Sequence, residues 1–108
     1  VFSYWNFMKI HFDHAGLVET SLMLAMSNKV KMKFAKKGLT TNNLKSIEIS
    51  KLKKIAAKSF PKATKTGVWG NPSEASKKVG KKLMSEIVKN LEKKCQTCLT
   101  GKNPKLHQ

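Results

Sequence analysis

Arginine is absent from the chain, and acidic residues are scarce. All 22 basic residues among the 108 are lysine, against 6 aspartate and glutamate residues, so the formal net charge is +16. Arginine is the usual residue for paired hydrogen bonds to bases and for stacking on them, so its absence argues against sequence-specific nucleic-acid recognition. Lysine can still neutralise phosphates, and a non-specific contact with nucleic acid therefore stays open.

Long apolar runs and cysteine are also in short supply. Glu19 interrupts the most apolar stretch, Leu17–Met26, so no run approaches the roughly 18 residues of a membrane span. No basic segment precedes an apolar run at the start, which argues against a secretory signal. Two cysteines do not make a disulfide framework, so we expect a cytoplasmic protein without a membrane partner.

The residues that are present predict two helices with an apolar face. Residues 17–27 carry Val18 and Leu22 at helical spacing, and Glu19 falls in the first turn, where a carboxylate suits the helix dipole. The second helix is expected to begin at residues 71–74, with Asn71 as cap and Pro72 at the first position. It runs for about six turns through apolar residues at strict fours, Val79, Leu83, Ile87 and Leu91.

Two other segments give weaker patterns. The opening residues 1–8 are rich in aromatic side chains and indicate a strand or an extended segment covered by other structure. In the middle of the chain, Ser50 could cap a short helix that ends before Phe60 and Pro61.

Three sets of residues could carry chemistry, and each has an ordinary alternative. His14 and Glu19 could form an acid–base pair, or they could be a polar loop histidine and a carboxylate at a helix start. Cys95 and Cys98 have the spacing of a redox or metal motif, with His107 nearby, but structural zinc needs four ligands. Trp69, which lies between two glycines of a turn, could anchor that turn or form a pocket wall.

Two ordered motifs resemble the creatininase (creatinine amidohydrolase) family. Residues 14–24, HAGLVETSLML, resemble its HAGxxETSLML signature. Residues 66–72, TGVWGNP, followed by Ala75, Ser76 and Gly80, are similar to the family segment that precedes its last helix. The family has aspartate where this chain has Asn71, and either residue can cap a helix. The resemblance covers roughly residues 4–93.

The resemblance implies an α/β protein, the C-terminal part of a three-layer α/β/α fold with a mostly parallel sheet. It implies hydrolysis of a cyclic or linear amide C–N bond in a small molecule, with a divalent metal, zinc or manganese, and assembly into homo-oligomers such as hexamers. His14 matches the family histidine that shuttles the proton, and Glu19 matches the glutamate that supports it. Residues 1–94 would be the creatininase-like portion and residues 95–108 a basic, flexible tail.

The family's metal ligands lie upstream, in a Glu-x-His cassette and a Gly-His-rich segment, and neither motif occurs in this sequence. No metal ligand is therefore assigned in this chain. We expect a fragment of the enzyme that is inactive alone and needs the missing N-terminal portion or a partner chain. The alternatives are a lysine-rich module that binds nucleic acid non-specifically and a non-catalytic structural subunit.

Overall fold

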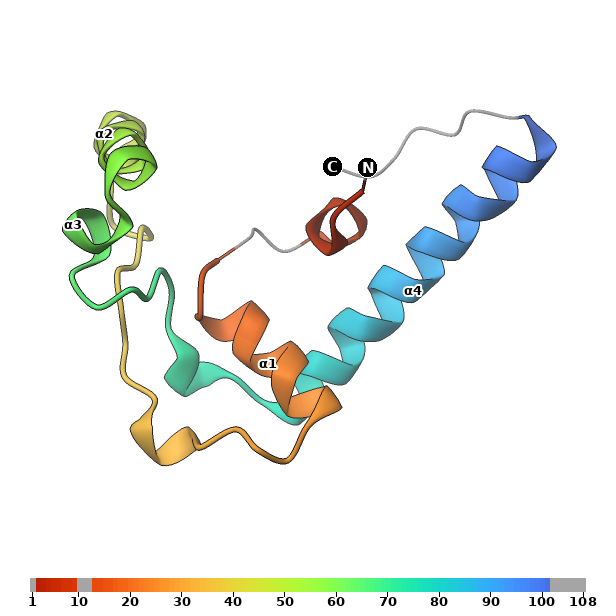
Figure 1. The fold of residues 1–108 in the computed structure, drawn as a ribbon, viewed down its shortest axis with the longest axis horizontal. Coiled ribbons are helices and arrows are strands. Elements are labelled where there is room, and N and C mark those ends of the chain that lie inside the picture. The colour runs from red at the N-terminus through yellow and green to blue at the C-terminus, as the bar shows by residue number, and fades with distance from the viewer. Residues whose placement is uncertain (1, 10–12, 102–108) are drawn as a thin grey trace.

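A computed structural model of the chain describes residues 2–9 and 13–101 (Figure 1). Within these residues the chain forms four α-helices joined by loops and three short 3-10 helices. In chain order the elements are η1 (Tyr4–Phe7), α1 (Leu17–Met26), η2 (Met32–Phe34), α2 (Ser46–Lys58), α3 (Phe60–Thr64), η3 (Pro72–Glu74) and α4 (Lys77–Thr100).

The expected three-layer α/β/α fold with a parallel sheet is wrong for the described residues, which form helices and no strand. Extended backbone pairs there as isolated bridges, His14 with Trp69 in antiparallel sense and Leu39 with Trp69 in parallel sense. A sheet gains its stability from several strands of about five residues that pair along their length. These three segments meet through single bridged residues, so the pairing does not propagate into a sheet.

The opening aromatic segment contains a 3-10 helix, Tyr4–Phe7, where the sequence predicted a strand or an extended segment. The Ser3 amide donates to the side-chain oxygen of Asn6 at 2.9 Å, and the Asn6 amide donates to the Ser3 carbonyl at 3.0 Å. Phe7 at its end is 3% exposed, and the side-chain amide of Asn90 in α4 donates to the Phe7 carbonyl at 2.8 Å. Phe7 is therefore covered by α4, whereas Phe2 and Trp5 of the same segment are 51% and 45% exposed.

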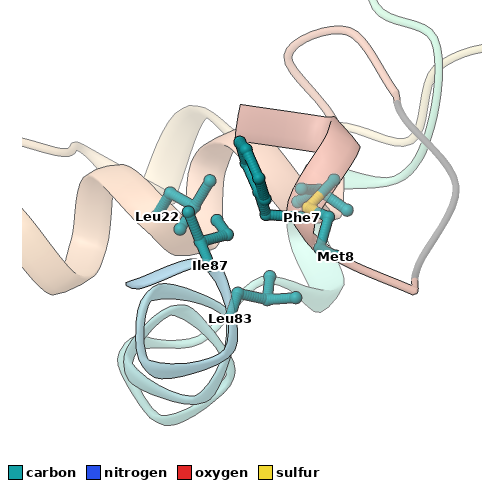
Figure 2. Packing of buried hydrophobic residues seen from close by; sticks show 6 residues of the cluster. Phe7, Met8, Leu22, Leu83 and Ile87 are labelled. Atoms are coloured by element: carbon teal, nitrogen blue, oxygen red, sulfur yellow. The ribbon is translucent and has the colours of Figure 1, made fainter. Parts of the chain in front are cut away.

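The hydrophobic core lies where η1, α1 and α4 meet. Figure 2 shows the side chains that converge there from the three elements. The buried members are Phe7, Met8, Val18, Leu22, Leu83 and Ile87. The apolar stripe predicted for the long helix accordingly faces the core at Leu83 and Ile87, because residues four apart share one face of a helix.

Helices α1 and α4 cross closely at Gly80. A Cβ atom at this position would overlap the backbone carbonyl of Ser21. At the same crossing the Ser21 hydroxyl accepts a hydrogen bond from the backbone amide of Ser76 at 3.1 Å. Glycine is needed here because it lets two helix backbones approach without a side chain between them.

Two helices begin at residues other than those expected. Asn71 does cap a turn, through a hydrogen bond from the Ser73 amide, but that turn is the separate element η3. The long helix α4 starts five residues later, with Ser76 accepting from the Val79 amide. In the middle segment, α2 starts at Ser46, so Ser50 lies inside the helix and does not cap it.

Helices α2 and α3 pack on each other, away from the core (Figure 1). At the other end of the chain, α4 continues without a break across the expected boundary at residue 94 and ends at Thr100. Over residues 2–9 and 13–101, none of the helices combines the length and the apolar character that a membrane span requires.

Candidate functional site

His14 lies in a turn that is fixed by the two isolated bridges. Its backbone amide donates to the Trp69 carbonyl at 2.9 Å, and the Trp69 amide donates back to the His14 carbonyl at 2.8 Å. Trp69 is held from its other side by Leu39, whose carbonyl accepts from the Gly70 amide at 2.6 Å. The two sequence motifs are thus joined through their backbones, although 55 residues separate His14 from Trp69.

The imidazole of His14 is oriented by a backbone carbonyl. Its Nδ1 lies 2.9 Å from the carbonyl oxygen of Gly67. A carbonyl can only accept, so in the neutral ring the proton lies on Nδ1 and the lone pair lies on Nε2. The Gly67 amide is itself fixed by the side-chain hydroxyl of Thr64, at 2.9 Å. His14 therefore presents a basic nitrogen in a defined direction.

His14 forms part of the wall of a groove of ≈ 570 Å³ between its own turn and helices α2 and α3. Aromatic rings form much of this wall: Phe60 lies 4.6 Å from the His14 ring and 6.4 Å from the Trp69 ring, centroid to centroid. The groove is lined by Asp13, His14, Thr41, Ile49, Lys53, Ala56, Phe60 and Trp69. Its size and its mixture of aromatic and polar groups suit a small organic molecule. Trp69 is thus both the anchor of a turn and a pocket wall.

Asp13 holds the start of α1 beside this groove. Its carboxylate accepts hydrogen bonds from the backbone amides of Val18, at 2.9 Å, and Glu19, at 3.4 Å. Helix N-termini leave amides without partners inside the helix, and Asp13 satisfies two of them. Burial raises the pKa of Asp13, while the two amide hydrogen bonds act in the opposite direction. The Asp13 carboxyl is consequently committed to the helix and does not carry the groove's chemistry.

Glu19 lies in the first turn of α1, as the sequence predicted, and contacts the turn that bears His14. One of its oxygens accepts from the Ala15 amide at 2.5 Å, and the other accepts from the Tyr4 hydroxyl at 3.4 Å. Ala15 has φ 52°, a left-handed conformation that costs a residue with a side chain roughly 1 kcal/mol. Glu19 thus stabilises a strained residue directly after His14.

The side chains of His14 and Glu19 face different spaces. His14 lines the aromatic groove, whereas Glu19 lines an apolar groove of ≈ 460 Å³ with Tyr4, Leu22 and Met84. The hydrogen bonds of Glu19 run to the backbone of the turn and to Tyr4, so it reaches His14 through Ala15. In this arrangement Glu19 contacts the turn that bears His14, and the acid–base pair suggested by the sequence stays a prediction.

Several groups of the site are not predicted by the sequence. The sequence predicts only a strand or an extended segment at Tyr4 and no contact with Glu19. In the structure burial first, and then the charge and hydrogen bond of Glu19, raise the pKa of Tyr4 to about 12. From the sequence, Phe60 is only the place where a helix ends, and Lys53 is one lysine among many. In the structure both residues line the groove with His14. One feature of the sequence could have pointed to Phe60 as a groove residue. It is an aromatic residue beside Pro61, and the sequence pattern assigns it no packing partner in the core. Nothing in the sequence distinguishes Lys53.

The described part of the chain does not hold a metal site by itself. Across residues 2–9 and 13–101, no three side chains of His, Cys, Asp or Glu gather closely enough to bind an ion. Cys95 and Cys98 are exposed free thiols on α4, a helix that contributes no residue to the lining of the groove. His107, considered above as a possible further ligand, lies outside the described residues.

The comparisons with known proteins agree with the motifs. The family model described as creatininase, creatinine amidohydrolase, matches residues 5–95. Neither the curated proteins nor the solved structures gave a match. The matched residues include the His14 turn, the aromatic groove and the core between α1 and α4. Because the match covers most of the chain, this protein belongs to the creatinine amidohydrolase family.

Proposed function

We propose that this chain supplies the proton-transfer side of an amidohydrolase site, with His14 as the catalytic base and then acid. The observation that carries the proposal is the hydrogen bond between His14 Nδ1 and the Gly67 carbonyl, which leaves Nε2 with its lone pair beside a groove of ≈ 570 Å³. Family membership supports amide hydrolysis as the reaction class. The groove's volume supports a small amide as substrate.

Amide hydrolysis needs a proton to be moved twice. A water molecule must lose a proton as it attacks the carbonyl carbon, and the departing nitrogen must gain one as the C–N bond breaks. Nε2 of His14 can take the first proton and deliver it to the nitrogen, because Nδ1–H stays anchored on Gly67 throughout. The rings of Phe60 and Trp69 would then hold the flat amide against the imidazole.

Glu19 has the role of holding His14 in place. Its carboxylate fixes the strained Ala15 amide and is itself fixed by Tyr4. A shift of the turn by about 1 Å would carry the imidazole out of reach, and such displacements cost a large share of activity. We therefore assign His14 as the catalytic residue and Glu19 as its positioning residue.

The family generally depends on a metal, which would polarise the amide carbonyl and supply the attacking water. The described residues do not fit that metal, since no three ligand side chains gather among them. We propose that the metal-binding groups come from a segment upstream or from another chain, and that this chain alone does not hydrolyse amides.

A split-enzyme experiment tests the proposal. The chain is mixed with the metal-binding N-terminal portion of a complete family member, and hydrolysis of creatinine and of a panel of linear amides is measured with zinc or manganese. We expect activity in the mixture and none from either part alone. The His14→Gln variant should associate equally well but lose activity by about a hundredfold or more.

Glu48→Gln is the matched control, because this exposed glutamate of α2 lies outside the groove and should leave the complemented activity unchanged. Association of the two parts without activity would contradict the proposal. Full activity of His14→Gln would contradict the role of the imidazole, whatever the substrate.

A further inference from the structure

Cys95 and Cys98 form a pair of thiols on the last turns of α4. Both are free and exposed, and a separation of three residues places them on one face of the helix. Figure 1 shows this end of α4 extending beyond the part of the molecule where α1 and η1 pack against it. The pair takes no part in the groove that contains His14.

Two thiolates are half of a structural zinc site. Zinc in such sites is bound by four ligands in a tetrahedron, and four cysteine thiolates are one of the usual sets. One chain cannot complete the set from the described residues, among which no third His, Cys, Asp or Glu joins the two thiols. A second copy of the chain would bring the two ligands that are missing.

The helix face around the thiols suits a second helix. Val88, Leu91 and Leu99 on this part of α4 are 54%, 41% and 87% exposed. Positions 88, 91, 95 and 98 follow the alternating three- and four-residue spacing by which two helices pair along a seam. Apolar side chains at such a seam gain by being covered, and the same face of a second copy offers them matching partners.

The positive charge of the chain opposes the pairing of two copies. Each chain carries a formal charge of +16, and Lys93 and Lys94 flank the thiols, so two copies repel each other. A zinc ion bound by four thiolates has an excess of negative charge, which the neighbouring lysines of both copies would offset. Pairing should therefore depend on the metal, because without it nothing offsets the repulsion between the two positively charged copies.

From the incomplete ligand pair, the apolar seam and the flanking lysines, we propose that Cys95 and Cys98 bind zinc together with the same pair from a second copy. The metal would join the two α4 helices near their C-terminal ends. The thiols lose their protons on binding, and no oxidation or reduction takes place. The site is structural, since all four positions on the metal are filled by protein ligands.

Metal titration of the reduced, purified chain tests this proposal. Cobalt(II) is added first, because cobalt bound to thiolates absorbs intensely, and zinc is then added to displace it. The molecular mass is followed by light scattering, in the presence of a phosphine reductant. We expect saturation at about one metal for two chains, a doubling of the mass, and a return to the monomer when a chelator is added.

Variants of α4 test the two thiols, their spacing and the apolar seam in turn. Cys95→Ser and Cys98→Ser should each lose the cobalt–thiolate absorption and the metal-dependent doubling of mass. In the spacing control, Cys98→Ser is combined with Gln96→Cys, which keeps two thiols but places them on different faces of α4, and it should behave like the single variants. Val88→Lys changes an exposed apolar residue of the seam, keeps both thiols and should weaken the doubling of mass. Circular dichroism verifies that each variant keeps its helices.

Saturation at one metal per chain without a change in mass would overturn the proposal, since the ligands would then come from a single chain. Binding by the spacing control equal to that of the wild type would also overturn it, because any two thiols would then suffice. So would the absence of a cobalt–thiolate absorption band in the reduced protein. None of these readouts depends on amide hydrolysis, so the proposed function is tested separately.

Discussion

The carboxylate of Glu19 accepts the backbone amide hydrogen of Ala15 at 2.5 Å, immediately after His14 in the chain. Ala15 holds a left-handed conformation with φ 52°, so this hydrogen bond stabilises a residue that would otherwise leave that conformation. The direction of the His14 imidazole thus depends on a side chain that does not contact it. Removing the charge of Glu19 should therefore loosen the turn.

Glu19→Gln should lower the free energy of unfolding by about 1–2 kcal/mol, because it replaces a charged acceptor shared by two donors with a neutral one. Urea unfolding measures the loss, and the Ala15 amide resonance should shift in the NMR spectrum. Glu92→Gln, at an exposed position of α4, is the control and should change stability by less than about 0.5 kcal/mol. Equal stability of Glu19→Gln and the wild type would refute the stabilising role of this carboxylate.

The local patterns of the sequence predicted the two helices that build the core. Val18 and Leu22 on α1, and Leu83 and Ile87 on α4, are buried as their helical spacing indicated. This succeeded because helix periodicity is set by residues three and four apart in the chain. The start of α4 was misplaced because Asn71 and Pro72 favour any helical turn, and here they form a turn of three residues.

Long-range relationships could not be read from the sequence. The expected sheet depended on strands that would have to pair at a distance, and in the described part of the chain such pairing is limited to the single bridges of His14, Leu39 and Trp69. The contact of Tyr4 with Glu19 joins residues 15 apart through the packing of η1, for which the sequence has no local signal. The groove likewise requires α2 to lie beside His14, and neither segment specifies that by itself.

The second prediction concerns Asp13 and pH. Burial raises the pKa of this carboxyl above its ordinary value of 3.8, so the folded protein binds its proton more tightly than the unfolded chain does. The stability that comes from this difference is fully present below pH 3.8 and is lost as the pH rises through the pKa that Asp13 has in the folded protein. The Asp13→Asn variant has no titrating carboxyl at this position, so its stability lacks this contribution.

Urea unfolding of the wild type and of Asp13→Asn from about pH 3.5 to about pH 7 measures this contribution. The stability of the wild type relative to the variant should decrease as pH rises across that window. Taking the difference between the two proteins removes the effect of every other titrating group. Parallel curves for the two proteins would show that the pKa of Asp13 is the same in the folded and unfolded states.

The third prediction uses the single tyrosine of the chain. Burial, and then the charge and hydrogen bond of Glu19, raise the pKa of Tyr4 from 10.0 to about 12. The folded protein therefore holds the hydroxyl proton of Tyr4 more tightly than the unfolded chain does. The resulting stability is fully present below pH 10.0 and is lost as the pH rises through about 12. Ultraviolet absorbance of tyrosinate reports this one residue, and its midpoint in the folded protein should lie near 12.

The same titration of the Glu19→Gln variant should give a lower midpoint, since the variant lacks the negative charge that disfavours tyrosinate. The urea-unfolded chain provides the reference and should titrate near the ordinary value of 10.0. A folded protein that titrates with this reference would place Tyr4 in water and away from Glu19.

The fourth prediction concerns the crossing of α1 and α4. Alanine at position 80 would place its Cβ on the carbonyl oxygen of Ser21, and neither helix backbone can move aside without separating the core residues Leu22 and Leu83. Gly80→Ala should therefore destabilise the protein by about 1–3 kcal/mol, although alanine is the better helix former in isolation by about 1 kcal/mol. Ser85→Ala, at an exposed position of the same helix, measures the propensity effect alone and should be neutral or slightly stabilising. Thermal unfolding of both variants decides the matter, because a Gly80→Ala protein as stable as Ser85→Ala would mean that the two helices do not approach each other at this residue.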